Sequence, residues 1–122
     1  MATTSPDGQI RVQLDIARAL EQIGDEATMR SMLPMLQELL ERDVPKITQL
    51  LASHDVRGAN PLLHSLKGCL PIFCTQALCE QMSEVEHMSK AGEGPEVGKA
   101  YGFLLPKLQD LQKEVIQYLA LP

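Results

Sequence analysis

Apolar residues recur every three or four positions along most of this chain, and this spacing constrains the fold more than any other feature of the sequence. It places the apolar side chains on one face of an α-helix. The clearest stripe, in which gaps of four and three residues alternate, consists of Val97, Tyr101, Leu104, Leu108, Leu111, Val115 and Tyr118. Because no segment shows the polar–apolar alternation of a half-buried β-strand, we predict an all-α protein.

The composition favours a core of aliphatic side chains. Hydrophobic residues make up 44% of the 122 residues, whereas aromatic residues make up only 3% and Trp is absent. Helices that pack against helices suit such a core, and a chain of this length forms one domain. We predict a flexible polar tail over residues 1–8 and a single helical domain over residues 9–122.

Capping residues and prolines divide the first half of the chain into two predicted helices. The first spans about residues 10–23, where Gly24 suits its end and Asp25 suits the cap of the next helix. The second extends to about residue 52 and includes Pro34 and Pro45. Because proline lacks a backbone N–H and crowds the preceding turn, we expect a kink or a break in this helix, most of all at Pro45.

Three more helices are predicted in the second half. The third follows Asp55 and extends to about residue 73, and Thr75 suits the cap of a fourth that reaches Lys90. The fifth begins near Pro95, a residue that is common in the first turn of a helix. We therefore predict an antiparallel four-helix bundle with a short extra N-terminal helix.

Charge and cysteine content exclude several classes of protein. The net charge of −5 argues against nucleic-acid binding through bulk charge. No apolar run reaches the length of a membrane span, and the first residues lack the basic and apolar regions of a signal peptide. Three cysteines do not form a disulfide framework, and free thiols are typical of a reducing compartment. We expect a cytoplasmic protein without membrane insertion, and a monomer.

The third predicted helix contains the candidate site. Its apolar stripe, which includes Leu63 and Leu66, forms the buried face, and His64 falls almost opposite that face. Residues 56–79 contain no Asp or Glu but do contain Arg57 and Lys67. An exposed imidazole beside a cation, in a stretch of chain without carboxylates, suits the binding of an anion.

Residues 64–68 also resemble a known signature. The sequence His64-Ser65-Leu66-Lys67-Gly68 is similar to the His-x-Leu-Lys-Gly motif of histidine-containing phosphotransfer (HPt) domains, and the resemblance in helix order extends over most of the chain. It implies that His64 accepts a phosphoryl group from the aspartate of a receiver domain and passes it to another receiver. It also implies that Lys67 stabilises the added charge and that Gly68 leaves room for the partner.

The resemblance implies the partners as well. These are receiver domains of response regulators or hybrid sensor kinases, in a two-component phosphorelay, and we expect Arg57, Asn60 and Pro71 to contact them. The chain has no phosphate-binding glycine-rich loop, so we expect a phosphocarrier without ATP-dependent kinase activity and without a cofactor of its own. Magnesium is expected only in the receiver. If the chain is a domain excised from a longer protein, the parent protein would be a hybrid histidine kinase.

The stretch from Cys69 to Cys74 departs from the family pattern, which has small polar residues after the glycine and another glycine where Cys74 stands. This departure motivates an alternative function, a non-catalytic helical module that docks a receiver or a kinase without phosphotransfer. Cysteines five residues apart on a helix diverge, and we predict no metal site. The fourth predicted helix contains three polar residues that could orient His64: Gln81, Glu84 and His87. An ordinary solvated helix face explains them equally well.

Overall fold

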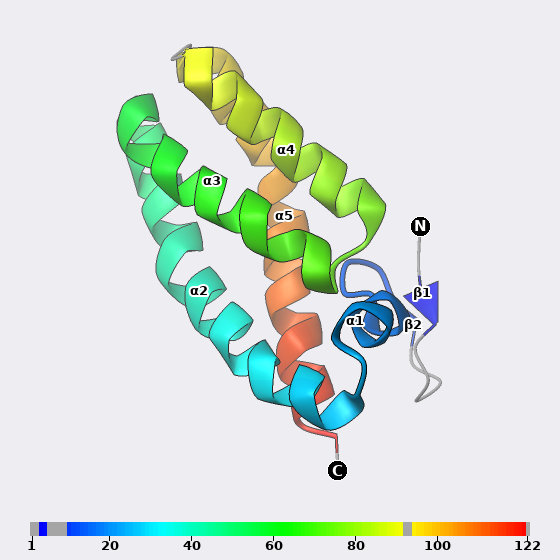
Figure 1. Ribbon diagram of the computed structural model, residues 1–122. Helices are drawn as coiled ribbons and strands as arrows, with labels where there is room; N and C mark the ends of the chain where they lie inside the picture. The colour runs from blue at the N-terminus through cyan, green and yellow to red at the C-terminus, as the bar shows by residue number, and fades with distance from the viewer. Residues whose placement is uncertain (1–2, 5–9, 92–93, 122) are drawn as a thin grey trace.

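The computed structural model describes residues 3–4, 10–91 and 94–121 (Figure 1). Its helices are α1 (Ile16–Ile23), α2 (Glu26–Ala52), α3 (Val56–Phe73), α4 (Gln76–Ala91) and α5 (Gly94–Leu119). Two strands of two residues each, β1 (Thr3–Thr4) and β2 (Ile10–Arg11), form an antiparallel pair. The predicted helical fold is confirmed. No helix in the described ranges is both long enough and apolar enough to cross a membrane.

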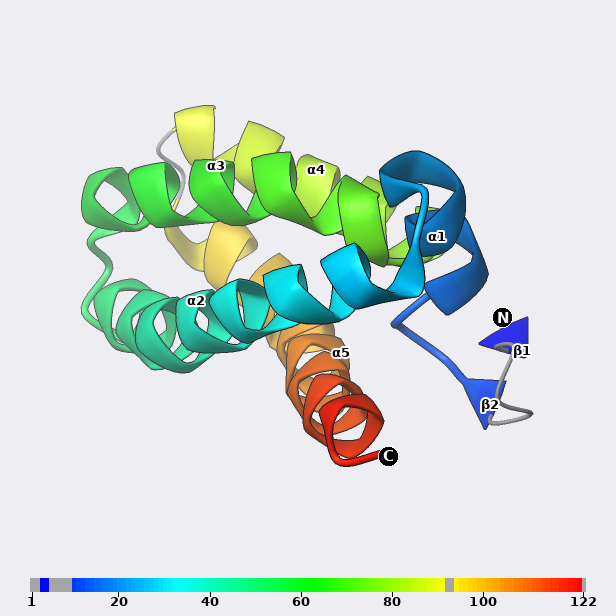
Figure 2. The same cartoon turned by 60° about the horizontal axis from the view of Figure 1, so that its bottom comes forward.

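The four longer helices surround one core. α3 packs against α2 and α4, and α5 packs against the same two helices. Figure 1 shows α3 in front of α5, between α2 and α4. The short α1 contacts α2 and α3 and lies at the end of the bundle where α2 begins (Figure 2).

The predicted apolar stripes form the core. Every member of the stripe on α5, from Val97 to Tyr118, is buried. On α3, Leu63 and Leu66 have no exposed surface, whereas Leu62 is only half-buried. The larger side chains with almost no exposed surface come from α1 to α4 and the segment before α1, and include Leu14, Ile16, Met29, Leu33, Leu36, Leu40, Ile47, Leu70, Phe73 and Leu78.

Four of the predicted capping residues lie at helix ends, namely Gly24, Asp25, Asp55 and Thr75. Gly24 adopts a φ of +106°, which a side chain would strain, and its N–H donates to the Leu20 carbonyl to end α1. The Asp25 carboxylate accepts from the Thr28 N–H at 2.7 Å at the start of α2. Similar caps start α3 and α4: the Asp55 carboxylate accepts from Gly58, and the Thr75 hydroxyl accepts from Leu78.

The predicted start of the first helix is wrong. α1 begins at Ile16, not at residue 10, because the Asp15 carboxylate caps it by accepting from the Arg18 N–H. The residues before it bond to the turn between α3 and α4, where the Asp15 N–H donates to the Phe73 carbonyl at 2.8 Å. In the predicted tail, Thr3–Thr4 pairs with β2, and the rest of that tail lies outside the described residues.

The predicted break in the second helix is also absent. α2 is assigned as one helix from residue 26 to residue 52, and both Pro34 and Pro45 lie on its exposed side. α3 likewise continues through Pro61 and Pro71. Each proline removes one hydrogen bond within its helix, but the buried stripe on the opposite side keeps the helix packed against its neighbours.

Candidate functional site

His64 lies on the outer surface of α3, as predicted. Its side chain is 69% exposed, while the flanking Leu63 and the nearby Leu66 have no exposed surface. The imidazole therefore contributes little to the core and is accessible to a second protein.

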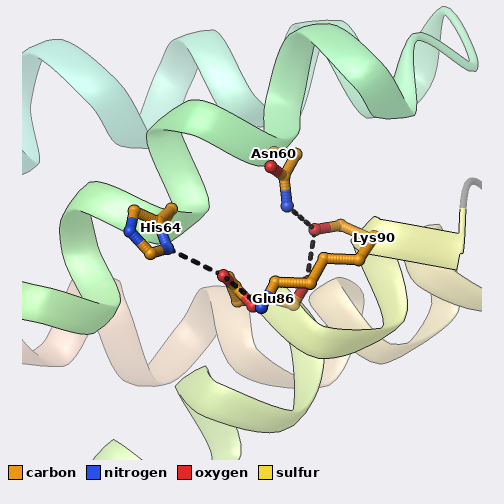
Figure 3. Close-up of polar contacts among 5 residues, drawn as sticks. Asn60, His64, Glu86 and Lys90 are labelled. Atoms are coloured by element: carbon orange, nitrogen blue, oxygen red, sulfur yellow. Dashed lines mark hydrogen bonds and ion pairs between the residues drawn. The ribbon is translucent and has the colours of Figure 1, made fainter.

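The ring is not free, because a buried carboxylate from α4 holds one of its nitrogens. Glu86 Oε1 lies 2.9 Å from His64 Nδ1, and the Glu86 side chain has no exposed surface (Figure 3). A carboxylate only accepts hydrogen bonds, so the neutral ring donates through Nδ1. The lone pair of the neutral ring is then at Nε2.

Two lysines surround the Glu86 carboxylate. The Lys90 ammonium lies 3.5 Å from the same Oε1, one turn further along α4. The hydrogen bond from His64 lowers the pKa of Glu86 most, and the positive charges of Lys67 and Lys90 lower it further, while desolvation opposes them. Glu86 is therefore ionised at neutral pH, and the site contains one buried negative charge that two cations stabilise.

Glu86 does not use all of its hydrogen-bond acceptors. Its second oxygen, Oε2, is buried and has no hydrogen-bond partner within the described parts of the chain. An unpaired buried oxygen costs free energy, because water is lost and nothing replaces it.

The other residues predicted for the site lie along α3. Lys67 is half-buried and Gly68 is exposed, with no atom within 4 Å of the position that a Cβ would occupy. Gly68 is thus not required for packing within the chain. Arg57 is exposed in the first turn of α3, and the Pro71 carbonyl accepts from the Gln22 side chain of α1 at 3.1 Å. Asn60 points toward α4, where its amide donates to Ser89 at 2.7 Å (Figure 3).

Sequence analysis missed Glu86 and Lys90. No carboxylate lies near His64 in the sequence of its own helix, but α4 brings the carboxylate of Glu86 into contact with it. Of the three candidates on the fourth helix, Gln81 accepts from Lys107 of α5, and Glu84 and His87 are exposed. One signal was present: Glu86 falls on the same face of its helix as the apolar residues Leu78, Met82 and Val85, which is the buried face of α4.

A shallow groove lies between α2 and α3, on the side of α3 away from α4. Its lining mixes apolar, polar and charged side chains: Met35, Glu38, Leu39, Arg42, Ser65 and Cys69. Met35 is 60% exposed and contributes apolar surface to the groove. The accessible surface of α3 thus continues from His64 toward a partly apolar groove.

The cysteines pack and do not form a reactive site. Burial raises the pKa of the Cys74 thiol well above its ordinary value, and it also raises the pKa values of Cys69 and Cys79. All three thiols are therefore protonated at neutral pH. Over the described ranges, no group of three or more His, Cys, Asp or Glu side chains is arranged to hold a metal ion.

Comparisons with protein-family models, with curated proteins and with solved structures find no match to this chain.

Proposed function

We propose that this protein is a phosphorelay intermediate in which His64 accepts a phosphoryl group from the aspartate of one receiver domain and passes it to another. The observation that supports this most is the exposed imidazole whose Nδ1 is held by the buried Glu86, which directs Nε2 outward as a nucleophile. A histidine that only solvates the surface needs no buried carboxylate. The resemblance of residues 64–68 to the HPt signature points to the same chemistry.

The proposed transfer step follows from the ring geometry. The Nε2 lone pair attacks the phosphorus of the receiver's aspartyl phosphate, so an N–P bond forms as the P–O bond to the aspartate breaks. The aspartate leaves as a carboxylate, and the Nδ1 proton stays on the ring. The ring becomes positively charged, and Glu86 compensates that charge at 2.9 Å. Transfer to the second receiver reverses these steps.

The neighbouring residues have complementary roles in this proposal. Lys67 and Lys90 offset the negative charge that the phosphoryl group brings, and Gly68 lets the receiver approach closely because no Cβ occupies that space. The magnesium ion belongs to the receiver. We infer that α2 to α5 form an antiparallel four-helix bundle that presents His64 to partners in the cytoplasm, with Arg57 at the edge of the contact.

Phosphotransfer from labelled receivers tests the proposal. The receiver domains encoded in the same genome are charged with radiolabelled phosphate and mixed with the native chain. We expect at least one of them to transfer label to this protein as an acid-labile, base-stable adduct. His64→Gln abolishes the transfer, whereas His87→Gln, a matched change at an exposed histidine of α4, leaves it intact.

Two outcomes contradict the proposal. Label that moves equally well to His64→Gln places the phosphoryl group elsewhere. Receivers that bind the native chain and His64→Ala with equal affinity, without transfer at any concentration, identify a docking module that does not exchange phosphate.

A further inference from the structure

A second polar contact joins α3 and α4 one helical turn from the pair of His64 and Glu86. The Asn60 side-chain amide donates to Ser89 Oγ at 2.7 Å. Asn60 precedes His64 by four residues, and Ser89 follows Glu86 by three, so each pair lies on one face of its helix. The two contacts therefore lie side by side across the interface (Figure 3).

The Ser89 hydroxyl links the two contacts. It has a single hydrogen, which it donates to the backbone carbonyl of Glu86 at 2.6 Å, so it accepts the hydrogen bond from Asn60. Ser89 is 3% exposed, and water does not readily replace either partner. Asn60 is thus connected through Ser89 to the backbone of the residue that orients His64.

We propose that Asn60 and Ser89 are positioning residues that set the register of α4 against α3 and so keep the Glu86 carboxylate on Nδ1 of His64. The consequence for phosphotransfer rests on the proposed function, whereas the effect on the ring does not.

A positioning contact is needed because His64 and Lys90 compete for the Glu86 carboxylate. The same Oε1 that binds His64 also lies 3.5 Å from Lys90, and Oε2 has no partner in the described residues. A small slide or rotation of α4 lengthens the contact with His64 and leaves Lys90, on the same helix, in place. Because the imidazole is 69% exposed, no packing holds the ring against that change. The hydrogen bond from Asn60 resists it, since it is made across the same interface.

Ser89→Ala and Asn60→Ala remove this contact from either side. The fraction of His64 with the proton on Nδ1 is measured by nitrogen NMR of the free protein, and the transfer rate is measured with a charged receiver. We expect both variants to shift the ring toward the Nε2–H tautomer and to slow transfer by about 2- to 10-fold, the range of one hydrogen bond. The double variant is no worse than either single one, because the pair acts as a unit.

Two further variants separate this role from general stability. Ser31→Ala removes a hydroxyl that donates to the Thr28 carbonyl at 2.6 Å, the same bond within a helix, but far along α2 from the site. We expect it to leave the tautomer and the rate unchanged. Ser89→Thr retains the hydroxyl, so we expect a native tautomer and a native transfer rate. If Ser89 only filled space, the larger threonine would be worse than alanine.

The results distinguish the two proposals. If Ser89→Ala keeps the native tautomer and a native rate, the positioning role is wrong while the phosphorelay stands. If the tautomer shifts but no receiver transfers phosphate to the native chain, the positioning role stands and the phosphorelay is wrong. Because the tautomer is measured without a receiver, it also separates this role from the partner contact predicted for Asn60.

Discussion

Two glutamates connect helices of this protein to other parts of the chain, and they do so in different ways. Glu114 of α5 accepts hydrogen bonds from the backbone N–H groups of Gln13 and Leu14, at 3.0 and 2.9 Å. Glu86 of α4 instead binds side chains: Oε1 accepts from His64 and pairs with Lys90, and Oε2 is buried without a partner in the described residues.

The difference separates a carboxylate that holds the fold together from one that prepares a site. The amides bonded to Glu114 belong to the segment that closes one end of the bundle, and that segment is anchored by these bonds. The His64 ring is 69% exposed and buries little surface when Glu86 binds it. A buried charge that binds an exposed ring gains little stability from this contact, whereas in the proposed function the same contact orients the reacting ring.

The largest expected effect on stability is at Glu114. Glu114→Ala leaves two backbone N–H groups without their acceptor, and we expect it to lower the free energy of unfolding by about 1–3 kcal/mol. Glu114→Gln costs less, since its amide oxygen still accepts. Urea denaturation measures both, with the transfer rate as a control that stays within about 2-fold. A rate that falls as far as in a Glu86 variant would erase the distinction between the two glutamates.

Glu86→Gln is expected to behave in the opposite way. The amide oxygen still accepts from Nδ1 but no longer compensates the charge of the phosphorylated ring, so we expect transfer to slow by about tenfold. The free energy of unfolding changes by less than about 1 kcal/mol, because the bonded ring is exposed. Transfer assays and urea denaturation are run on the same preparations. A native rate together with a large loss of stability would make Glu86 a structural residue like Glu114.

Two exposed glycines extend the comparison to the partner surface. Gly68 of α3 and Gly102 of α5 both have open space where a Cβ would lie. Replacement by alanine is therefore expected to stabilise each helix by about 0.5–1 kcal/mol, which thermal denaturation measures. Only Gly68→Ala is expected to slow phosphotransfer, since a receiver approaches His64 there. Equal transfer rates for the two variants would show that Gly68 leaves no space that a partner uses.

The smallest effect concerns acid stability. The folded-state pKa of Glu86 is lowered below its ordinary value of 4.5, chiefly by the hydrogen bond from His64. A lowered pKa contributes stability that is present above about pH 4.5 and is lost as the pH falls through the folded value. We therefore expect the free energy of unfolding to fall more for the native chain than for Glu86→Gln between pH 6 and pH 3. The difference between the two is less than about 1 kcal/mol. Parallel stability curves over this range would show that the pair contributes nothing to stability.

Much of the fold could be predicted because it depends on neighbours along the chain. The apolar stripe of α5, the ends of helices at Gly24 and Asp25, and the outward direction of His64 all follow from spacings of three or four residues. The same local reasoning was wrong about a break in α2 at Pro45, where packing of the opposite face keeps the helix continuous. It was also wrong before Ile16, where distant backbone partners replace a helix.

The sequence by itself determined which residues form helices and that an imidazole with a nearby lysine faces outward from one of them, because helical periodicity is a property of adjacent turns. Only the tertiary structure decided that Glu86, and not Glu84 or His87, meets that imidazole. That choice depends on how far α4 is rotated and shifted against α3, and a shift of one residue turns a helix by about 100°. Packing and polar contacts between the helices set that register, and no local pattern specifies it.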